Sequence, residues 1–203
     1  PQLWDGTARF GQSSGGTIIP GEDAVYTFET SGGSQHITQS KDTVSAHAAS
    51  GMTAPDFQGA IGVTADGVEG VDIAVPVFQF SETHYLPDSL VTPAYKATLF
   101  ALTGRVNDGT FKGFAAGECL FLGATGSKRG SGDWEITYRF AASPNATNLT
   151  LGDITGINKK GFEYLWVRYE DVEDTTAKAL VKRATAVYVE KVYLDGDLDL
   201  LGI

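Results

Sequence analysis

The sequence predicts a mainly β protein: a β-sandwich or barrel-like domain with one short α-helix, an extended N-terminal arm and long loops. Glycine is over-used, at 25 of 203 residues, which implies many tight turns between strands. Apolar and polar residues alternate along several segments of strand length, as expected for half-buried strands. Only one segment has the spacing of an amphipathic helix.

The first part of the chain differs in composition from the rest. Residues 1–35 are rich in Gly and Ser around an alternating segment at 24–29, so we expect an N-terminal arm that carries the first strand. Residues 36–203 are expected to form a single β-rich domain. Within it, residues 36–58 have no firm period and predict a long loop.

The following segments predict strands and the single helix. Strands are expected at 60–63 and 71–80, joined by a turn at Asp66-Gly67. Proline cannot donate to a strand ladder, so Pro76 places the second strand at a sheet edge or at a bulge. A helix is expected over 92–103, with Thr92 as N-cap, Pro93 in the first position, and three apolar residues on one face: Tyr95, Leu99 and Leu102.

Strands dominate the remainder of the chain. We expect a strand at 117–123, a flexible basic loop at 125–133, and a strand at 134–140 that buries Trp134, Ile136, Tyr138 and Phe140 on one face. Two later strands are expected at 162–169 and 186–194. The segment 170–183 would link them, with a helical turn at 176–180.

Charge and cysteine content narrow the possible functions. The net charge is -10, and residues 1–100 hold 11 acids against 3 bases. Such a chain should not bind nucleic acid, because binding to the phosphates requires clustered Lys and Arg side chains. An acidic surface could instead repel DNA that moves past it. The single Cys119 excludes an internal disulfide and is expected to be a buried, unreactive thiol. We expect no membrane span and see no signal peptide.

The sequence offers few groups for catalysis. His36, His47 and His84 lie outside any HExxH spacing, and no G-x-S-x-G elbow occurs. Residues 123–128 lack the spacing of a phosphate-binding loop. The acidic groups at Asp195, Asp197 and Asp199, and at Asp66, Glu69 and Asp72, could contribute to a Ca²⁺ site, but polar turns are the better interpretation. We therefore predict no enzyme, with no catalytic residue, metal ligand or cofactor.

Aromatic side chains leave a binding role open. Tyr85, Trp166 and Tyr188 could stack on sugars, although aromatics in alternating strands more often belong to a core or to a subunit interface.

The order of elements resembles one viral family. A strand at 71–80, a helix at 92–103, the segment 110–114 and a long hairpin at 117–140 resemble the tail tube proteins of tailed bacteriophages. The resemblance implies a virion subunit that forms a ring with its own copies, contacts neighbouring virion proteins, and lets DNA pass without specific binding. Residues 141–203 add two or more strands, which leaves a neck, tail-terminator, baseplate or capsid-decoration role open. Two more classes stay open: a carbohydrate- or host-surface-binding module, and a small enzyme without a known motif.

Overall fold

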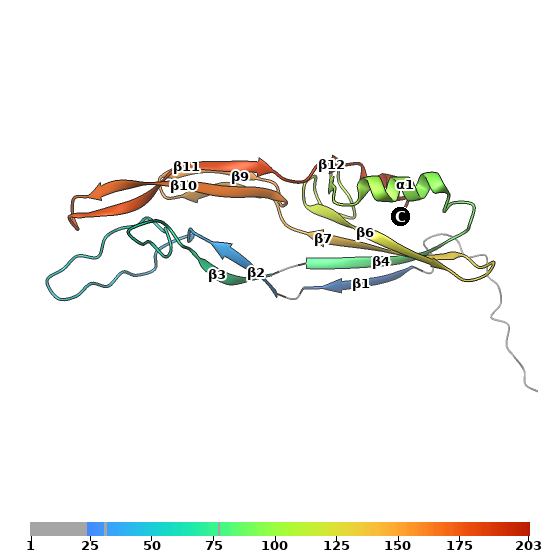
Figure 1. Cartoon of the computed structure of the whole chain (residues 1–203), viewed down its shortest axis with the longest axis horizontal. Helices are drawn as coiled ribbons and strands as arrows, with labels where there is room; N and C mark the ends of the chain where they lie inside the picture. The colour runs from blue at the N-terminus through green and yellow to red at the C-terminus, as the bar shows by residue number, and fades with distance from the viewer. Residues whose placement is uncertain (1–23, 31, 77) are drawn as a thin grey trace, which may run out of the picture.

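The computed structural model describes residues 24–203 except 31 and 77. Within this part of the chain the structure is mainly β with a single α-helix, which confirms the predicted fold class. The molecule is elongated (Figure 1). One half, here called the sheet half, is a six-stranded sheet with its helices; the other, the ribbon half, consists of three two-stranded ribbons and the loops that join them. Residues 1–23 of the predicted arm lie outside the described residues.

The six-stranded sheet has the order β1-β4-β7-β6-β5-β12. Neighbouring strands are antiparallel, except for the parallel pair β5 and β12. The strands span Val25–Glu29 (β1), Phe78–Leu86 (β4), Val106–Asn107 (β5), Cys119–Lys128 (β6), Trp134–Ala142 (β7) and Asp195–Gly196 (β12). The predicted first strand at 24–29 is thereby confirmed, since β1 pairs with β4 along its whole length.

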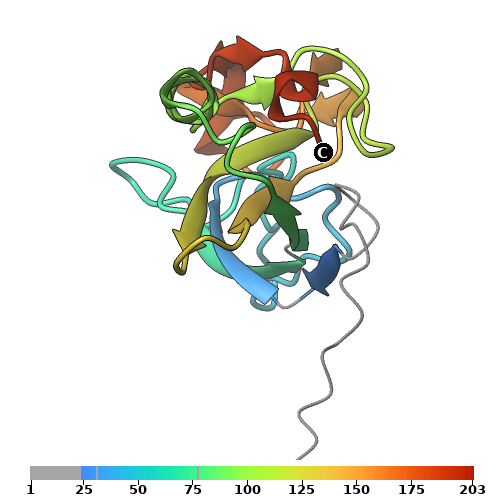
Figure 2. The same cartoon turned by 90° about the vertical axis from the view of Figure 1, so that its right-hand side faces the viewer.

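The hydrophobic core lies on one face of this sheet. Ile136, Tyr138 and Phe140 of β7 are buried there, which confirms the predicted alternation. The helix α1 (Pro93–Leu102) and the 3₁₀ helix η1 (Leu198–Leu201) lie over the same face (Figure 2). The predicted cap of α1 is confirmed, because the Thr92 hydroxyl accepts a hydrogen bond from the Tyr95 backbone N–H at 3.1 Å.

The ribbon half contains three antiparallel pairs. They are β2 (Gly32–Ile37) with β3 (Val71–Pro76), β8 (Ala146–Leu151) with β9 (Ile154–Lys159), and β10 (Glu163–Asp174) with β11 (Ala179–Lys191). The long β10–β11 ribbon is tied to the segment that follows β2: the Tyr169 hydroxyl lies 3.2 Å from the Thr38 carbonyl oxygen, and Asp174 accepts from the Asp56 backbone N–H at 3.0 Å.

Two predicted strands before α1 need correction. Residues 71–80 form parts of two strands, because β3 pairs with β2 whereas β4 pairs with β1 and β7. The edge position predicted from Pro76 is confirmed, since a two-stranded ribbon consists only of edges. The strand predicted at 60–63 is wrong: Ala60 and Val63 make only single bridges. The turn at Asp66-Gly67 is present, closed by the bond from the Thr64 N–H to the Gly67 carbonyl.

Two predicted loops are shorter than expected. β6 continues to Lys128 and pairs with β7 through Ser127, so only 129–133 connects the hairpin. The segment 170–183 contains no helical turn, because β10 and β11 extend through it and leave only 175–178 between them. In both places polar residues continue the strand because the ladder bonds are made by the backbone, whatever the side chains.

Candidate functional site

A buried polar cluster is the first candidate for chemistry. Glu82 and His84 point from β4 into the core, and the His84 Nε2 lies 3.0 Å from the Glu82 carboxylate. Lys112 donates to the same carboxylate oxygen at 2.9 Å. Glu82 and His84 are 6% and 4% exposed, so the groups satisfy one another and are closed to a substrate. We interpret this cluster as structural. The sequence pattern singled out His84 but gave no sign of its partner Glu82, or of the Lys112 that binds the same carboxylate.

Lys112→Met should lower the free energy of unfolding by about 2 kcal/mol, because it leaves the Glu82 carboxylate buried with a single partner. The loss stays below that of a fully buried pair, since Lys112 is partly exposed. Glu82→Leu should cost about 2 kcal/mol, because the freed lysine can reach water but the buried His84 ring loses its partner. Urea denaturation of the two single variants and the double variant checks this. A double variant as unstable as the sum of the singles would contradict the coupling.

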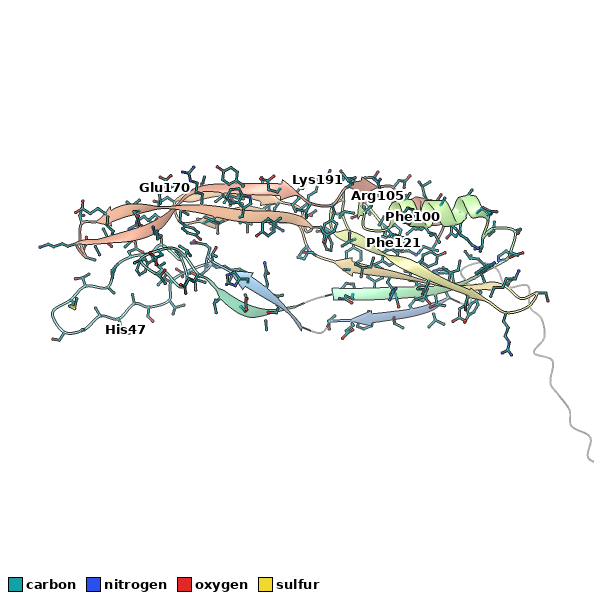
Figure 3. All side chains as sticks on the ribbon, viewed as in Figure 1. His47, Phe100, Arg105, Phe121, Glu170 and Lys191 are labelled. Atoms are coloured by element: carbon teal, nitrogen blue, oxygen red, sulfur yellow. The ribbon has the colours of Figure 1, made fainter. Side chains whose placement is uncertain are left out.

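The structure does not bring the three histidines together. His36 lies on β2, where its Nδ1 is 2.8 Å from the Asp72 carboxylate, and both side chains are exposed. His47 lies in the long loop after β2, at the end of the molecule remote from the sheet half (Figure 3). His84 is in the sheet half. These residues therefore do not form a common site.

The remaining sequence motifs belong to a strand, an ion pair and a helix cap. Residues 123–128 belong to β6 and pair with β7. Asp195 forms an ion pair with Lys191, and Asp197 caps η1 by accepting from the Asp199 N–H at 3.1 Å. Across residues 24–203, apart from 31 and 77, no group of three or more His, Cys, Asp or Glu residues is placed to hold a metal ion. In that same part of the chain, no helix has the length and apolarity needed to cross a membrane.

Cys119 is fully buried at the start of β6, as predicted. Burial raises the pKa of its thiol from 9.0 to about 12. The folded state therefore keeps the thiol protonated where the unfolded chain ionises. This contribution to stability is complete below pH 9 and is lost as the pH rises toward 12.

We expect Cys119→Ala to flatten the fall of the unfolding free energy above pH 9, measured by urea denaturation at successive pH values. Part of the fall should remain, because burial also raises the pKa of Tyr95 and of Tyr138. Equal slopes for the variant and the parent chain would show that the thiol does not contribute.

Exposed apolar residues form the second candidate for function. Strand β1 is the outermost strand of the six-stranded sheet, and its side chains Tyr26 and Phe28 are largely exposed, at 62% and 76%. Within the described part of the chain β4 is the one strand that pairs with β1, so the outer side of β1 can pair with a further strand. The opposite edge is blunted by the very short β12.

The β10–β11 ribbon carries a second exposed set. Trp166 and Tyr188 are cross-strand partners whose rings stack with centroids 4.2 Å apart, and both are about 40% exposed. Tyr164, also exposed, lies two residues before Trp166 on the same face of the strand. In the sequence, Trp166 and Tyr188 were separate candidates for stacking on sugars. The register of β10 and β11 places them side by side.

The ribbon half has almost no interior of its own. Among the described residues, Val181 is the one buried hydrophobic side chain that lies outside the sheet half. Large apolar side chains of the ribbons and their flanks are exposed instead: Val71, Ile73, Tyr164, Trp166, Val172, Leu180, Tyr188, Val192, Tyr193 and Leu194. This half therefore presents apolar surface that a stable monomer normally covers.

Comparison of the chain with protein-family models, with curated proteins and with solved structures gives no match.

Proposed function

We propose that this chain is a non-enzymatic structural subunit of a phage or phage-like virion, which assembles with its own copies and with neighbouring virion proteins. The observation that carries the proposal is the ribbon half, whose described residues expose many large apolar side chains and bury almost none. A two-stranded ribbon is only marginally stable alone in water. Contact with another subunit would supply the apolar cover that these ribbons lack.

The open edge of β1 supports the same proposal. Among residues 24–203 apart from 31 and 77, no strand pairs with the outer side of β1, and its side chains Tyr26 and Phe28 are exposed, which suits pairing with a second chain. Because β1 lies in the sheet half and the ribbons in the other half, each copy offers different surfaces to its neighbours. Such heterologous contacts close into rings or extend into tubes.

The assignment to a virion rests on the order of elements and on charge. β4, α1 and the β6–β7 hairpin follow one another as in the tail tube resemblance, which favours a tail tube, neck or other tail component. The acidic surplus of residues 1–100 suits a conduit through which DNA slides without specific binding. A capsid-decoration role is the alternative within the same class.

The native mass tests this proposal. Size-exclusion chromatography with light scattering over a range of protein concentrations should give masses several times 21.5 kDa, with rings or tubes in negative-stain images. A strictly monomeric chain at every concentration would contradict self-assembly.

Deletion of residues 1–16 is expected to leave the domain folded while assembly is lost, because the arm is predicted to contact the next copy. Thermal unfolding of the deletion variant and of the full chain checks the fold, and light scattering checks the mass. Retained assembly would count against a role for the arm.

One observation favours a second function. The exposed Trp166–Tyr188 stack lies beside Glu190, whose carboxylate accepts a bond from the Trp166 indole at 3.4 Å. Aromatic rings with nearby polar groups suit a carbohydrate, so a surface-binding module is the alternative. A monomer whose Trp fluorescence changes on titration with oligosaccharides, and no longer does so after Trp166→Ala, would favour it.

A further inference from the structure

The long loop after β2 projects into solvent. Residues 41–53 are all exposed, and the tip carries Val44 and Met52 at 95% and 72% exposure. Its base is fixed, because the Ser40 N–H donates to the Gly59 carbonyl at 2.8 Å and the Gln39 side chain donates to the Gln58 carbonyl at 2.7 Å. The loop is therefore anchored at its base and apolar at its tip.

The composition of this loop suits burial. Residues 43–55 contain no Lys, Arg, Asp or Glu, although the chain as a whole has a net charge of -10. Taking this stretch out of water would strip no charged group of its hydration, which is the most expensive part of desolvation. An uncharged projection can also approach another copy of an acidic protein without direct repulsion.

An apolar groove lies in the opposite half of the molecule. It runs between α1 and the β6–β7 hairpin, has a volume of about 400 Å³, and is lined by Val91, Leu99, Phe100 and Trp134 among others. Phe100 is 84% exposed. The charged side chain at the groove, Lys96, has its ammonium 4.2 Å from the centre of the Trp134 ring, so this charge already has a partner.

The loop cannot reach the groove of its own chain. His47 in the loop and Phe100 beside the groove lie in opposite halves of the long axis (Figure 3). An occupant from this protein must therefore come from another copy. Because the loop and groove are different surfaces, the contact would be head-to-tail and would repeat from copy to copy.

We propose that the loop segment of residues 43–55 of one copy docks into the groove between α1 and the β6–β7 hairpin of the next copy. Val44 and Met52 enter the groove and cover Phe100. This inference rests on the proposed self-assembly and names the surfaces that carry it along the long axis of the subunit. The fixed base of the loop reduces the conformational entropy lost on docking.

Two single substitutions test the contact. Met52→Asp places a charge on the loop tip, and Phe100→Asp places one at the groove. Each is expected to shorten assemblies along the long axis at least about tenfold in electron micrographs, because a charge would be buried without a partner. Ala65→Asp, in the exposed turn before Gly67, and Ala94→Asp, at the start of α1, add the same charge elsewhere and should leave assembly length unchanged.

Mixing the two variants gives the sharpest result. Met52→Asp keeps an intact groove and Phe100→Asp keeps an intact loop, so one productive contact remains between them. The mixture should therefore give assemblies two copies deep along the long axis, and each variant alone should give assemblies one copy deep. Both substituted side chains are exposed, so the variants should fold. Unfolding midpoints equal to that of the parent chain would verify this.

The outcomes separate this inference from the proposed function. If the parent chain assembles and either single variant assembles to the same length, the loop–groove contact is wrong while self-assembly stands. If the mixture stays one copy deep, the two surfaces are not partners. If the parent chain is monomeric at every concentration, the proposed function itself fails, and this inference fails with it.

Discussion

Phe140→Ala is expected to lower the free energy of unfolding by about 4 kcal/mol, the largest effect of any substitution considered for this chain. Phe140 is fully buried at the centre of the core. Its ring lies 4.8 Å from that of Phe80, 5.3 Å from Phe121 and 5.4 Å from Phe111, measured between centroids. Truncation removes these contacts and leaves a cavity that residues from three other segments of the chain would have to close. Urea denaturation followed by circular dichroism measures the loss.

Phe100→Ala is the matched control. The same side chain is removed, but at a helix position that is 84% exposed, and alanine is a good helix former. The free energy of unfolding should change by less than about 0.5 kcal/mol. Similar losses at Phe140 and Phe100 would mean that the core is not where the structure places it.

Asn107→Ala is expected to cost about 3 kcal/mol, because a single buried side chain satisfies several backbone groups. The Asn107 amide nitrogen donates to the carbonyls of Gly109 and Ala115 at 2.6 and 2.9 Å, and its oxygen accepts from the Cys119 N–H at 2.8 Å. The side chain therefore fixes the loop that brings Lys112 over the core. Urea denaturation measures the stability, and hydrogen exchange at residues 108–118 reports the loosened loop.

Asn158→Ala controls for the loss of an asparagine as such. Its side chain accepts one bond, from the exposed Asn148 N–H at 2.9 Å, so water can replace it. We expect a loss below about 1 kcal/mol. An equal loss at the two sites would contradict the role given to the buried network around Asn107.

The elements that the sequence predicted well are those whose signal is local. Helix α1 has its cap, its proline and its apolar face within a few residues, and β7 has a regular alternation that matches one buried face. The strand at 60–63 was wrong for the opposite reason. Its short apolar run suits a strand, but in the structure it meets only isolated bridge partners.

Elements whose pairing depends on distant residues were missed. β2 is a Gly- and Ser-rich stretch with little strand propensity, and it becomes a strand because β3, more than thirty residues later, pairs with it in full register. β8 and β9 were not recognised as a pair, because bulges interrupt their register. Tertiary pairing decides these segments, whatever their local propensity.

The candidate surfaces were predicted only in part. The alternation in 162–169 predicted a half-buried strand, and burial does alternate along this part of β10, with Trp166 stacked on Tyr188 on the more exposed face. A periodic pattern reveals two different faces but does not say whether a layer of the same chain covers the apolar one. The groove beside Phe100 gave no signal in the sequence, because its walls come from α1 and from the β6–β7 hairpin.

The placement of η1 governs the order in which the chain can fold during synthesis. Leu198 and Leu201 close the core over α1, and the Leu201 carbonyl accepts a bond from the Tyr95 hydroxyl at 2.8 Å. The strands and the helix that they cover leave the ribosome many residues earlier. In the nascent chain the apolar face of the sheet therefore stays uncovered until residue 201 emerges, while the apolar side chains of the ribbons are already exposed to solvent. We expect this intermediate to bind chaperones, and to aggregate when synthesis stalls before residue 198.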